Sequence, residues 1–348
     1  MMKRTSLFLA AACMTLAAAA EVTYQTVPLP QQIAIDPSGK QALLIKGQAV
    51  TYPAGNDKMK STAELAGKYL SLTPQVADKK AVPGVQLSLG LKSENPEAYL
   101  ITVDKKGIRI QGASESGVFY GVQTLRKSVM EEKGDTIRLP YATVSDEPRF
   151  GYRGTMLDCA RHFFPVSFVK EFIDILALHG VNRFHWHLTD DQGWRFEVKS
   201  LPELAVKGSV RPCTVVGKNI GVGNAAGAIY DDTPETGYYT QEEMKEIVRY
   251  AEDRFITIVP EIDLPGHMIA ALSVYPELGC TGGPYNVWCR WGIAQDVLCA
   301  GNPKTLDFLH KVMDEVCEVF PGKLIHIGGD ESPRNRWKAC PKCQKKMK

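Results

Sequence analysis

Two adjacent carboxylates, Asp330 and Glu331, follow the segment Ile325-His-Ile-Gly-Gly329. The two glycines would let a ligand approach the backbone closely. Adjacent residues of an extended segment point in different directions, so this pair is poorly placed to flank a glycosidic bond from opposite sides. The pair instead suits substrate assistance, in which Glu331 acts as acid and then base while Asp330 orients a 2-acetamido group of the sugar and stabilises its positive charge. The alternative is that the pair only caps the next helix.

Further polar residues could support this chemistry. A general acid needs neighbours that manage the proton it loses. We expect His267, held by Asp190 or Asp263, to do so through a hydrogen-bonded relay, although a purely structural histidine is the alternative. Arg153 would point its fork of donors at vicinal sugar hydroxyls, or else form a salt bridge to a carboxylate of the same domain.

The elements that must position these residues begin at Phe150, where strands and helices alternate. One helix should begin at Pro165 and end at Gly180, another should start with a capping box at Thr240-Gln-Glu-Glu243, and Asn302-Pro303 should cap a third. Repeated strand-helix units predict parallel strands, and hence a TIM-type barrel or a doubly wound sheet. The four strands are expected over residues 152–157, 181–188, 255–261 and 323–328.

Each polar cluster comes at the carboxyl end of one of these strands. Asp158 and Arg161 follow the first, Asp190 ends the second, and the remaining candidates follow the third and fourth. In a barrel these ends converge on one mouth, where active sites are built. Four clusters on four strands are a stronger signal than any one of them.

The preceding part of the chain, residues 21–147, is predicted to be a small supporting α/β domain. Strand-like alternation covers Val85 to Leu91 and Tyr99 to Ile110, and helical spacing covers Glu115 to Met130. Ser145-Asp-Glu-Pro148 is a plausible linker to the barrel domain, which we place at residues 148–348.

Residues 1–20 have the layout of a secretory signal peptide. Lys3 and Arg4 precede an apolar run that is too short to span a bilayer, and small residues lead to Ala20, where cleavage is expected. A lipoprotein anchor on Cys13 is a minor alternative. We therefore expect an exported protein, periplasmic or extracellular, with no membrane span.

Export permits disulfides among the remaining cysteines. Cys280 and Cys299 are our candidate pair. Cys340-Pro-Lys-Cys343 has the spacing of half a zinc site, but the sequence shows no second pair at a suitable spacing, so a local disulfide or free thiols are expected there.

Composition excludes other classes of partner. Lys and Arg number 41 against 39 Asp and Glu, which gives no electrostatic reason to expect nucleic acid or an anionic membrane as a partner.

Four motifs together resemble glycoside hydrolase family 20, the β-N-acetylhexosaminidases. They are Tyr152-Arg-Gly-Thr-Met-Leu-Asp158 with Arg161-His-Phe-Phe164, His185-Trp-His-Leu-Thr-Asp-Asp-Gln-Gly-Trp194, Pro260-Glu-Ile-Asp-Leu-Pro-Gly-His267 and His326-Ile-Gly-Gly-Asp-Glu331. The resemblance covers the family's N-terminal α/β domain and the first half of its barrel, about four β-α units, so we expect a truncated form of a longer protein.

The resemblance implies a role for each residue. Glu331 matches the general acid/base, Asp330 the residue that polarises the acetamido group, and His267 with Asp190 the network around the acid, with Asp263 in the same motif. Arg153 matches the arginine that binds sugar hydroxyls. It also implies retaining cleavage of terminal β-linked N-acetylglucosamine or N-acetylgalactosamine, with no metal or cofactor.

Two other functions compete with this one. A metal-dependent barrel hydrolase would use His185-x-His187, completed by Asp190, His267 and Asp330. A catalytically inactive carbohydrate-binding protein would keep the fold without turnover.

Overall fold

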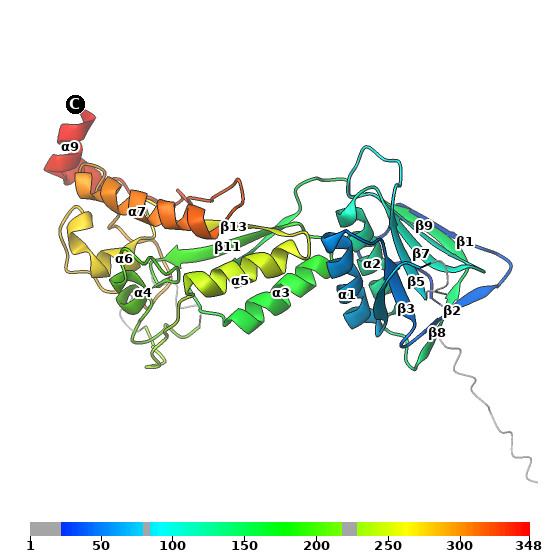
Figure 1. Cartoon of the computed structure of the whole chain (residues 1–348). Helices are drawn as coiled ribbons and strands as arrows, with labels where there is room; N and C mark the ends of the chain where they lie inside the picture. The colour runs from blue at the N-terminus through cyan, green and yellow to red at the C-terminus, as the bar shows by residue number, and fades with distance from the viewer. Residues whose placement is uncertain (1–21, 79–83, 218–227) are drawn as a thin grey trace, which may run out of the picture.

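The computed structural model describes residues 22–78, 84–217 and 228–348 (Figure 1). The predicted signal peptide, including Cys13, lies outside these residues. A sheet-rich N-terminal domain and a second domain of parallel strands and helices lie side by side along the molecule (Figure 1). No helix in the described ranges is long and apolar enough to cross a lipid bilayer.

The N-terminal domain is built on a seven-stranded sheet, with a separate two-stranded ribbon beside it. Its strands, in sheet order, are β1 (Gln32–Ile35), β9 (Ala142–Asp146), β6 (Tyr99–Asp104), β7 (Gly107–Gly112), β5 (Val85–Leu89), β3 (Ala49–Tyr52) and β4 (Thr73–Val76), and the ribbon pairs β2 (Gln41–Ile45) with β8 (Thr136–Pro140). Two helices, α1 (Asp57–Leu70) and α2 (Glu115–Val129), pack on one face of the sheet, on the side nearer the second domain (Figure 1).

Local sequence explains these elements. Val118, Val122, Leu125 and Val129 form the buried face of α2, as their spacing predicted, and Ser114 caps the helix by accepting a hydrogen bond from the Ser116 N–H. The stretch of alternation from Tyr99 to Ile110 forms a hairpin, in which β6 pairs antiparallel with β7 and Asp104 lies opposite Gly107.

The second domain contains a parallel sheet in the order β10-β11-β13, with each strand followed by helical segments. Its strands are β10 (Gly154–Asp158), β11 (Arg183–Asp190), the short antiparallel β12 (Gly193–Trp194) and β13 (Thr257–Ile262). Its helices are α3 (Val166–Leu178), α4 (Glu203–Gly208), α5 (Gln241–Glu252), α6 (Ile269–Val274), the 3-10 turn η1 (Pro276–Leu278), α7 (Pro303–Val319), α8 (Asn335–Ala339) and α9 (Pro341–Met347). This is the strand-helix alternation that the sequence predicted.

The helix signals in this domain are confirmed. Pro165 is the N-cap of α3, and the reciprocal hydrogen bonds between Thr240 and Glu243 form a capping box at the start of α5. Asn302 caps α7 by accepting from the Lys304 N–H, with Pro303 as the first helical residue.

The fourth predicted strand, 323–328, is not formed as a regular strand. The segment runs along the edge of β13 through a parallel bridge between His326 and Glu261. Just beyond that bridge, the N–H of Leu264 donates to Ile327 O at 3.0 Å. Its other edge pairs with no strand among the described residues, which explains why a regular strand is not formed there. The half-barrel is therefore open on this side and beyond β10.

Candidate active site

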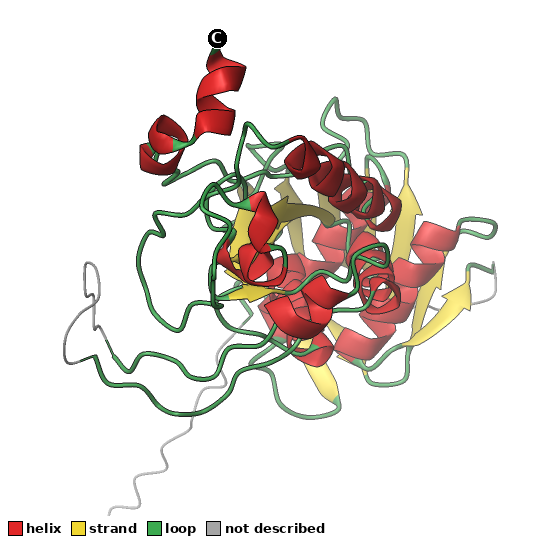
Figure 2. Cartoon of the chain, turned by 90° about the vertical axis from the view of Figure 1, so that its left-hand side faces the viewer, coloured by secondary structure: helices red, strands yellow, loops and turns green. Residues whose placement is uncertain are grey.

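The carboxyl ends of the parallel strands point to one end of the second domain, and loops surround that end (Figure 2). The described side chains that meet there include Asp190 from the end of β11, Asp263 and His267 from the loop after β13, and Asp330 and Glu331 from the segment that follows 323–328. The predicted convergence of these five residues is therefore present.

His267 is the centre of the cluster. Its side chain is 1% exposed, and its Nδ1 lies 3.2 Å from Asp190 Oδ1 and 3.3 Å from Asp191 Oδ2. Its Nε2 faces the other way, 3.4 Å from Glu331 Oε2 and 3.7 Å from Asp330 Oδ2. These are ion-pair contacts, because neither ring nitrogen makes a well-angled hydrogen bond to a described residue.

The charge of His267 follows from these neighbours. Burial lowers the pKa of the imidazole, but the carboxylates of Asp190 and Asp191 outweigh burial and raise it to about 11. His267 is therefore a buried imidazolium at neutral pH. Its positive charge therefore lies next to the carboxylates of Asp330 and Glu331, both of which are largely accessible to solvent.

Asp330 and Glu331 do not diverge as an extended segment would require. Both carboxylates reach the same nitrogen of His267, and the contacting oxygens of this group lie within 4.8 Å of one another. The expectation that the two side chains point in different directions is wrong because the backbone turns here: Glu331 has φ 41° and the preceding Gly328 and Gly329 have φ 59° and 95°. A non-glycine residue with positive φ stores strain, which is characteristic of functional sites, and His267, with φ 51°, shares this feature.

Asp263 lies beneath this turn. Its Oδ1 accepts a hydrogen bond from the Gly329 N–H at 3.3 Å, and a Cβ on Gly328 would lie only 1.8 Å from the same oxygen. Burial raises the pKa of Asp263 to about 7, with a further contribution from Asp330, while His267 and the Gly329 N–H act in the opposite direction. Gly328 is therefore required for Asp263 to pack against the loop that carries the catalytic candidates.

A second ion-pair network lies beside the first. Arg161 contacts Asp158 at 2.8 Å and the buried Asp190 at 2.7 Å, and its guanidinium lies 5.3 Å from the ring centroid of the exposed Trp291. His187 is buried between Asp158 and Asp190, at 3.4 and 3.5 Å. Arg161 is thus a partly exposed cation at the mouth, held by carboxylates on two strands.

Arg153 is not brought to this site, which corrects the role expected for it. It precedes β10, at the amino end of the strand and therefore at the opposite end from the mouth. Its two terminal nitrogens bind the carboxylate of Glu97 in the N-terminal domain at 2.7 and 3.1 Å, and its Nε donates to Gly180 O. All three guanidinium nitrogens of Arg153 therefore bind protein groups, and the side chain links the two domains.

The metal-hydrolase alternative is not supported by the geometry. His185 pairs with Glu261 at 2.6 Å, which also contacts His326, whereas His187 belongs to the carboxylate network described above. Among the described residues no potential ligand group contains both His185 and His187. The two histidines of the His-x-His spacing therefore form ion pairs with different carboxylates, Glu261 for His185 and Asp158 with Asp190 for His187.

Sequence reasoning located two further residues of the site at strand ends but gave them no role. Asp191 contacts His267 and accepts the Ile269 N–H at 3.0 Å, and Arg161 is the arginine at the mouth. Both followed predicted strands within the motifs already noted. Their position at carboxyl strand ends was the signal that could have selected Arg161 over Arg153.

Comparison with known proteins agrees with this geometry. Residues 150–348 match the model of the glycosyl hydrolase family 20 catalytic domain, and residues 23–147 match domain 2 of the same family. A β-hexosaminidase of Porphyromonas gingivalis is 42% identical over 298 residues, which are 84% of this chain and 36% of that protein. A β-hexosaminidase of Vibrio furnissii is 43% identical over 253 residues, or 72% of this chain and 40% of that protein.

A solved structure has the same architecture. The family 20 exo-β-N-acetylglucosaminidase of Vibrio harveyi, in complex with N-acetylglucosamine, superposes with a TM-score of 0.75 at 31% identity, covering 94% of this chain and 50% of that one. This likeness confirms the TIM-barrel fold class. The chain spans about two fifths of the length of the two curated relatives above. With both of its domains matched to the family, this chain belongs to glycosyl hydrolase family 20.

Proposed function

We propose that these residues form part of the active site of a retaining exo-β-N-acetylhexosaminidase. The observation that carries the proposal is the convergence of Asp330 and Glu331 on one nitrogen of a buried, charged His267. The proposal concerns the barrel-complete protein, by which we mean this chain joined to the remaining part of the barrel that its relatives possess.

In the first step Glu331 donates a proton to the glycosidic oxygen as the bond to the anomeric carbon breaks. The carbonyl oxygen of the sugar's own 2-acetamido group attacks that carbon and forms an oxazolinium intermediate. Glu331, now ionised, then takes a proton from water, which opens the intermediate and restores the β configuration. Glu331 and Asp330 lie on the same side of the site, so they are not arranged as an inverting pair, which would be separated by about 6.5–9.5 Å.

The neighbours of Glu331 have distinct tasks. Asp330 orients the acetamido group and stabilises the positive charge that develops on it. His267 balances the negative charge that Glu331 acquires, and Asp190 and Asp191 hold the imidazolium in place. Asp263 supports the turn that carries both carboxylates.

Arg161 replaces Arg153 as the proposed ligand of sugar hydroxyls. Its guanidinium is partly exposed at the mouth and is oriented by Asp158 and Asp190, and its fork suits vicinal hydroxyl groups. Trp291, which is 58% exposed, offers an adjacent apolar face for a sugar ring.

The predicted leader supports a second proposal, that the protein is exported and acts on glycans outside the cytoplasm. The substrates would be chains that end in β-linked N-acetylglucosamine or N-acetylgalactosamine.

Participation of the acetamido group can be tested with aryl β-glucosaminides that carry acetyl, fluoroacetyl or trifluoroacetyl groups on nitrogen. Fluorine weakens the carbonyl oxygen as a nucleophile, so kcat/KM of the barrel-complete protein should fall by roughly two orders of magnitude across the series. Asp330→Asn should lower the rate with the acetyl substrate, with Asp314→Asn on the exposed face of α7 as the control. A rate that does not depend on fluorination would contradict substrate assistance.

A further inference from the structure

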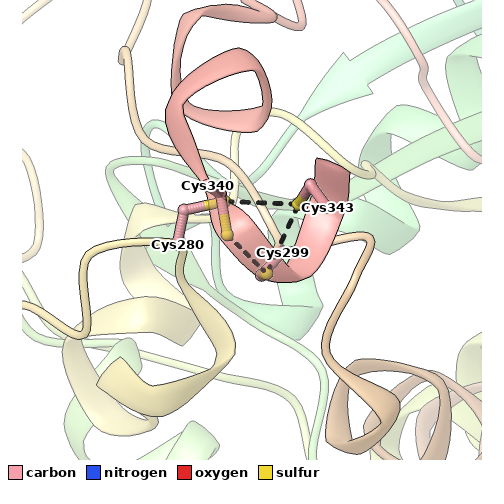
Figure 3. Close-up of side chains that lie close together, drawn as sticks. All are labelled: Cys280, Cys299, Cys340 and Cys343. Atoms are coloured by element: carbon pink, nitrogen blue, oxygen red, sulfur yellow. Dashed lines mark hydrogen bonds between the residues drawn. The ribbon is translucent and has the colours of Figure 1, made fainter. Parts of the chain in front are cut away.

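Four cysteines from three separate stretches of the sequence meet at one place in the fold (Figure 3). Cys280 follows η1, Cys299 precedes α7, Cys340 lies between α8 and α9, and Cys343 is in α9. Cys299, Cys340 and Cys343 are buried and Cys280 is partly buried. All four are free thiols, so the expected Cys280–Cys299 disulfide is not formed, and the pair thought to be missing beside Cys340 and Cys343 is present.

Three distances between the sulfur atoms match those of a tetrahedral metal site, and all four sulfur atoms lie within 4.8 Å of one another. Cys299 Sγ lies 3.6 Å from Cys343 Sγ and 3.7 Å from Cys340 Sγ, and Cys280 Sγ lies 3.8 Å from Cys343 Sγ. Four thiolates bound to zinc at about 2.3 Å have sulfur-sulfur separations of about 3.8 Å. A disulfide requires about 2.05 Å and pairs each sulfur with one partner, whereas Cys299 is equally close to two.

The backbone is shaped around these sulfur atoms. An antiparallel bridge between Gly279 and Leu298 brings Cys280 and Cys299 together, although 18 residues separate them. Gly301 packs against the turn between Cys340 and Cys343 so closely that a Cβ would lie 2.2 Å from the carbonyl carbon of Lys342.

The positive charge of the surrounding segment favours thiolate at this place. The segment 335–348 contains five lysines and one arginine and no acidic residue. These cations would offset the net charge of −2 that zinc with four thiolates carries.

We propose that Cys280, Cys299, Cys340 and Cys343 bind one zinc ion in a closed structural site. With four thiolate ligands the coordination shell is complete, so the ion has no open position for catalysis. The proposal does not depend on the hydrolase activity, because it rests on this cluster alone.

The site would fix the position of the segment that follows the catalytic loop. Residues beside the cluster already connect the same two segments: Trp337 Nε1 donates to Leu298 O at 2.8 Å, and Arg336 pairs with Asp296 at 2.8 Å. Leu298 in turn donates its N–H to Pro265 O, two residues before His267. Zinc would therefore secure the loops that hold His267 and Glu331.

The test measures metal and thiol state in the same preparation of the chain, purified without chelator or reductant. Elemental analysis should give about one zinc per chain, and peptide mapping after alkylation in denaturant and chelator should find all four cysteines reduced. Cobalt substitution should give the visible absorption of tetrahedral cobalt bound by four thiolates. Cys317→Ser, which removes the exposed cysteine of α7, should keep the metal, whereas Cys340→Ser and Cys343→Ser should lose it.

Cys280→His separates metal binding from disulfide formation. Histidine can replace a thiolate as a zinc ligand but cannot form a disulfide, so this variant should retain zinc while Cys280→Ser binds it more weakly. Less than about a tenth of an equivalent of zinc in the wild-type chain, together with these cysteines joined in disulfides, would overturn the proposal. So would iron in place of zinc, or zinc that persists when Cys340 and Cys343 are both replaced by serine.

Discussion

Asp263 is a buried carboxyl group whose protonation state should affect stability. Because burial raises its pKa to about 7, the folded protein binds a proton more tightly than the unfolded chain does, in which the value is about 3.8. The resulting stability is fully present below about pH 3.8 and is lost as pH rises through about 7. A neutral asparagine at this position would not show this loss.

Asp263→Asn should therefore change the pH dependence of unfolding. The free energy of unfolding of the wild type minus that of the variant should fall as pH rises from about 4 to about 7. Chemical denaturation of the barrel-complete protein at intervals across this range would measure it. A difference that is constant or rises with pH would show that Asp263 is not held protonated.

The two arginines near β10 have different environments and should behave differently when replaced. Arg161→Lys keeps the charge but loses the fork, so kcat/KM should fall about tenfold, corresponding to one charged hydrogen bond. Arg153→Lys should leave kcat/KM within about twofold and lower the free energy of unfolding by about 1–2 kcal/mol, because its bidentate contact with Glu97 is lost.

The steady-state kinetics and denaturation of both variants provide the measurement, and each variant is the control for the other. If Arg153→Lys impaired turnover while Arg161→Lys did not, the assignment made from the geometry would be reversed.

At the scale of elements, the loop after residue 327 depends on its two glycines for different reasons. Both glycines have positive φ. A Cβ on Gly328 would also collide with Asp263, whereas a Cβ on Gly329 would have no atom within 4 Å. Gly329→Ala should therefore cost only backbone strain, about 1–2 kcal/mol, and Gly328→Ala should cost about 1–3 kcal/mol more because Asp263 must move.

Denaturation curves of the two alanine variants test this difference, and activity gives a second measurement. Gly328→Ala should also reduce kcat, since the displaced turn carries Asp330 and Glu331. Equal effects of the two substitutions would mean that the contact with Asp263 does not shape the loop.

Much of the architecture could be predicted from local patterns. The capping box at Thr240, the cap at Asn302 and the buried stripe of α2 all depend on residues close in sequence, so short-range spacing revealed them. The convergence of His267 with Asp190 and Glu331 followed from the rule that parallel strands end on one face.

What could not be predicted depends on contacts across long sequence separations. Arg153 binds Glu97, which lies 56 residues earlier in another domain, and the sequence around Arg153 does not predict this partner. The cysteine cluster joins positions 63 residues apart, so Cys340 and Cys343 looked like an isolated pair. The left-handed backbone at Glu331 is not predicted by the propensity of glutamate, and it occurs in a turn whose Gly328 packs against Asp263, 65 residues earlier in the chain.

At the scale of the whole molecule, the open edges of the half-barrel expose apolar side chains. Met156 on β10 is 49% exposed, and Leu324 and Ile327 at the other edge are 53% and 52% exposed. An unpaired, apolar strand edge promotes association between molecules.

The 348-residue chain by itself should therefore bind the dye ANS strongly and self-associate as concentration rises, whereas the barrel-complete protein should do neither. Fluorescence titration with light scattering would measure both properties. A monomeric chain with no more dye binding than the barrel-complete protein would contradict this account of the edges.

The central claim, that Glu331 is the general acid/base, is tested most directly by the hydrolysis of aryl β-N-acetylglucosaminides by the barrel-complete protein and its Glu331→Gln variant. With a poor leaving group, kcat/KM of the variant should fall by about 10²–10⁴-fold, and the loss should be much smaller with a dinitrophenyl leaving group that needs no proton. Glu318→Gln, at an exposed position of α7, should match the wild type. If Glu331→Gln retained activity within a few-fold on the poor leaving group, Glu331 would not be the acid.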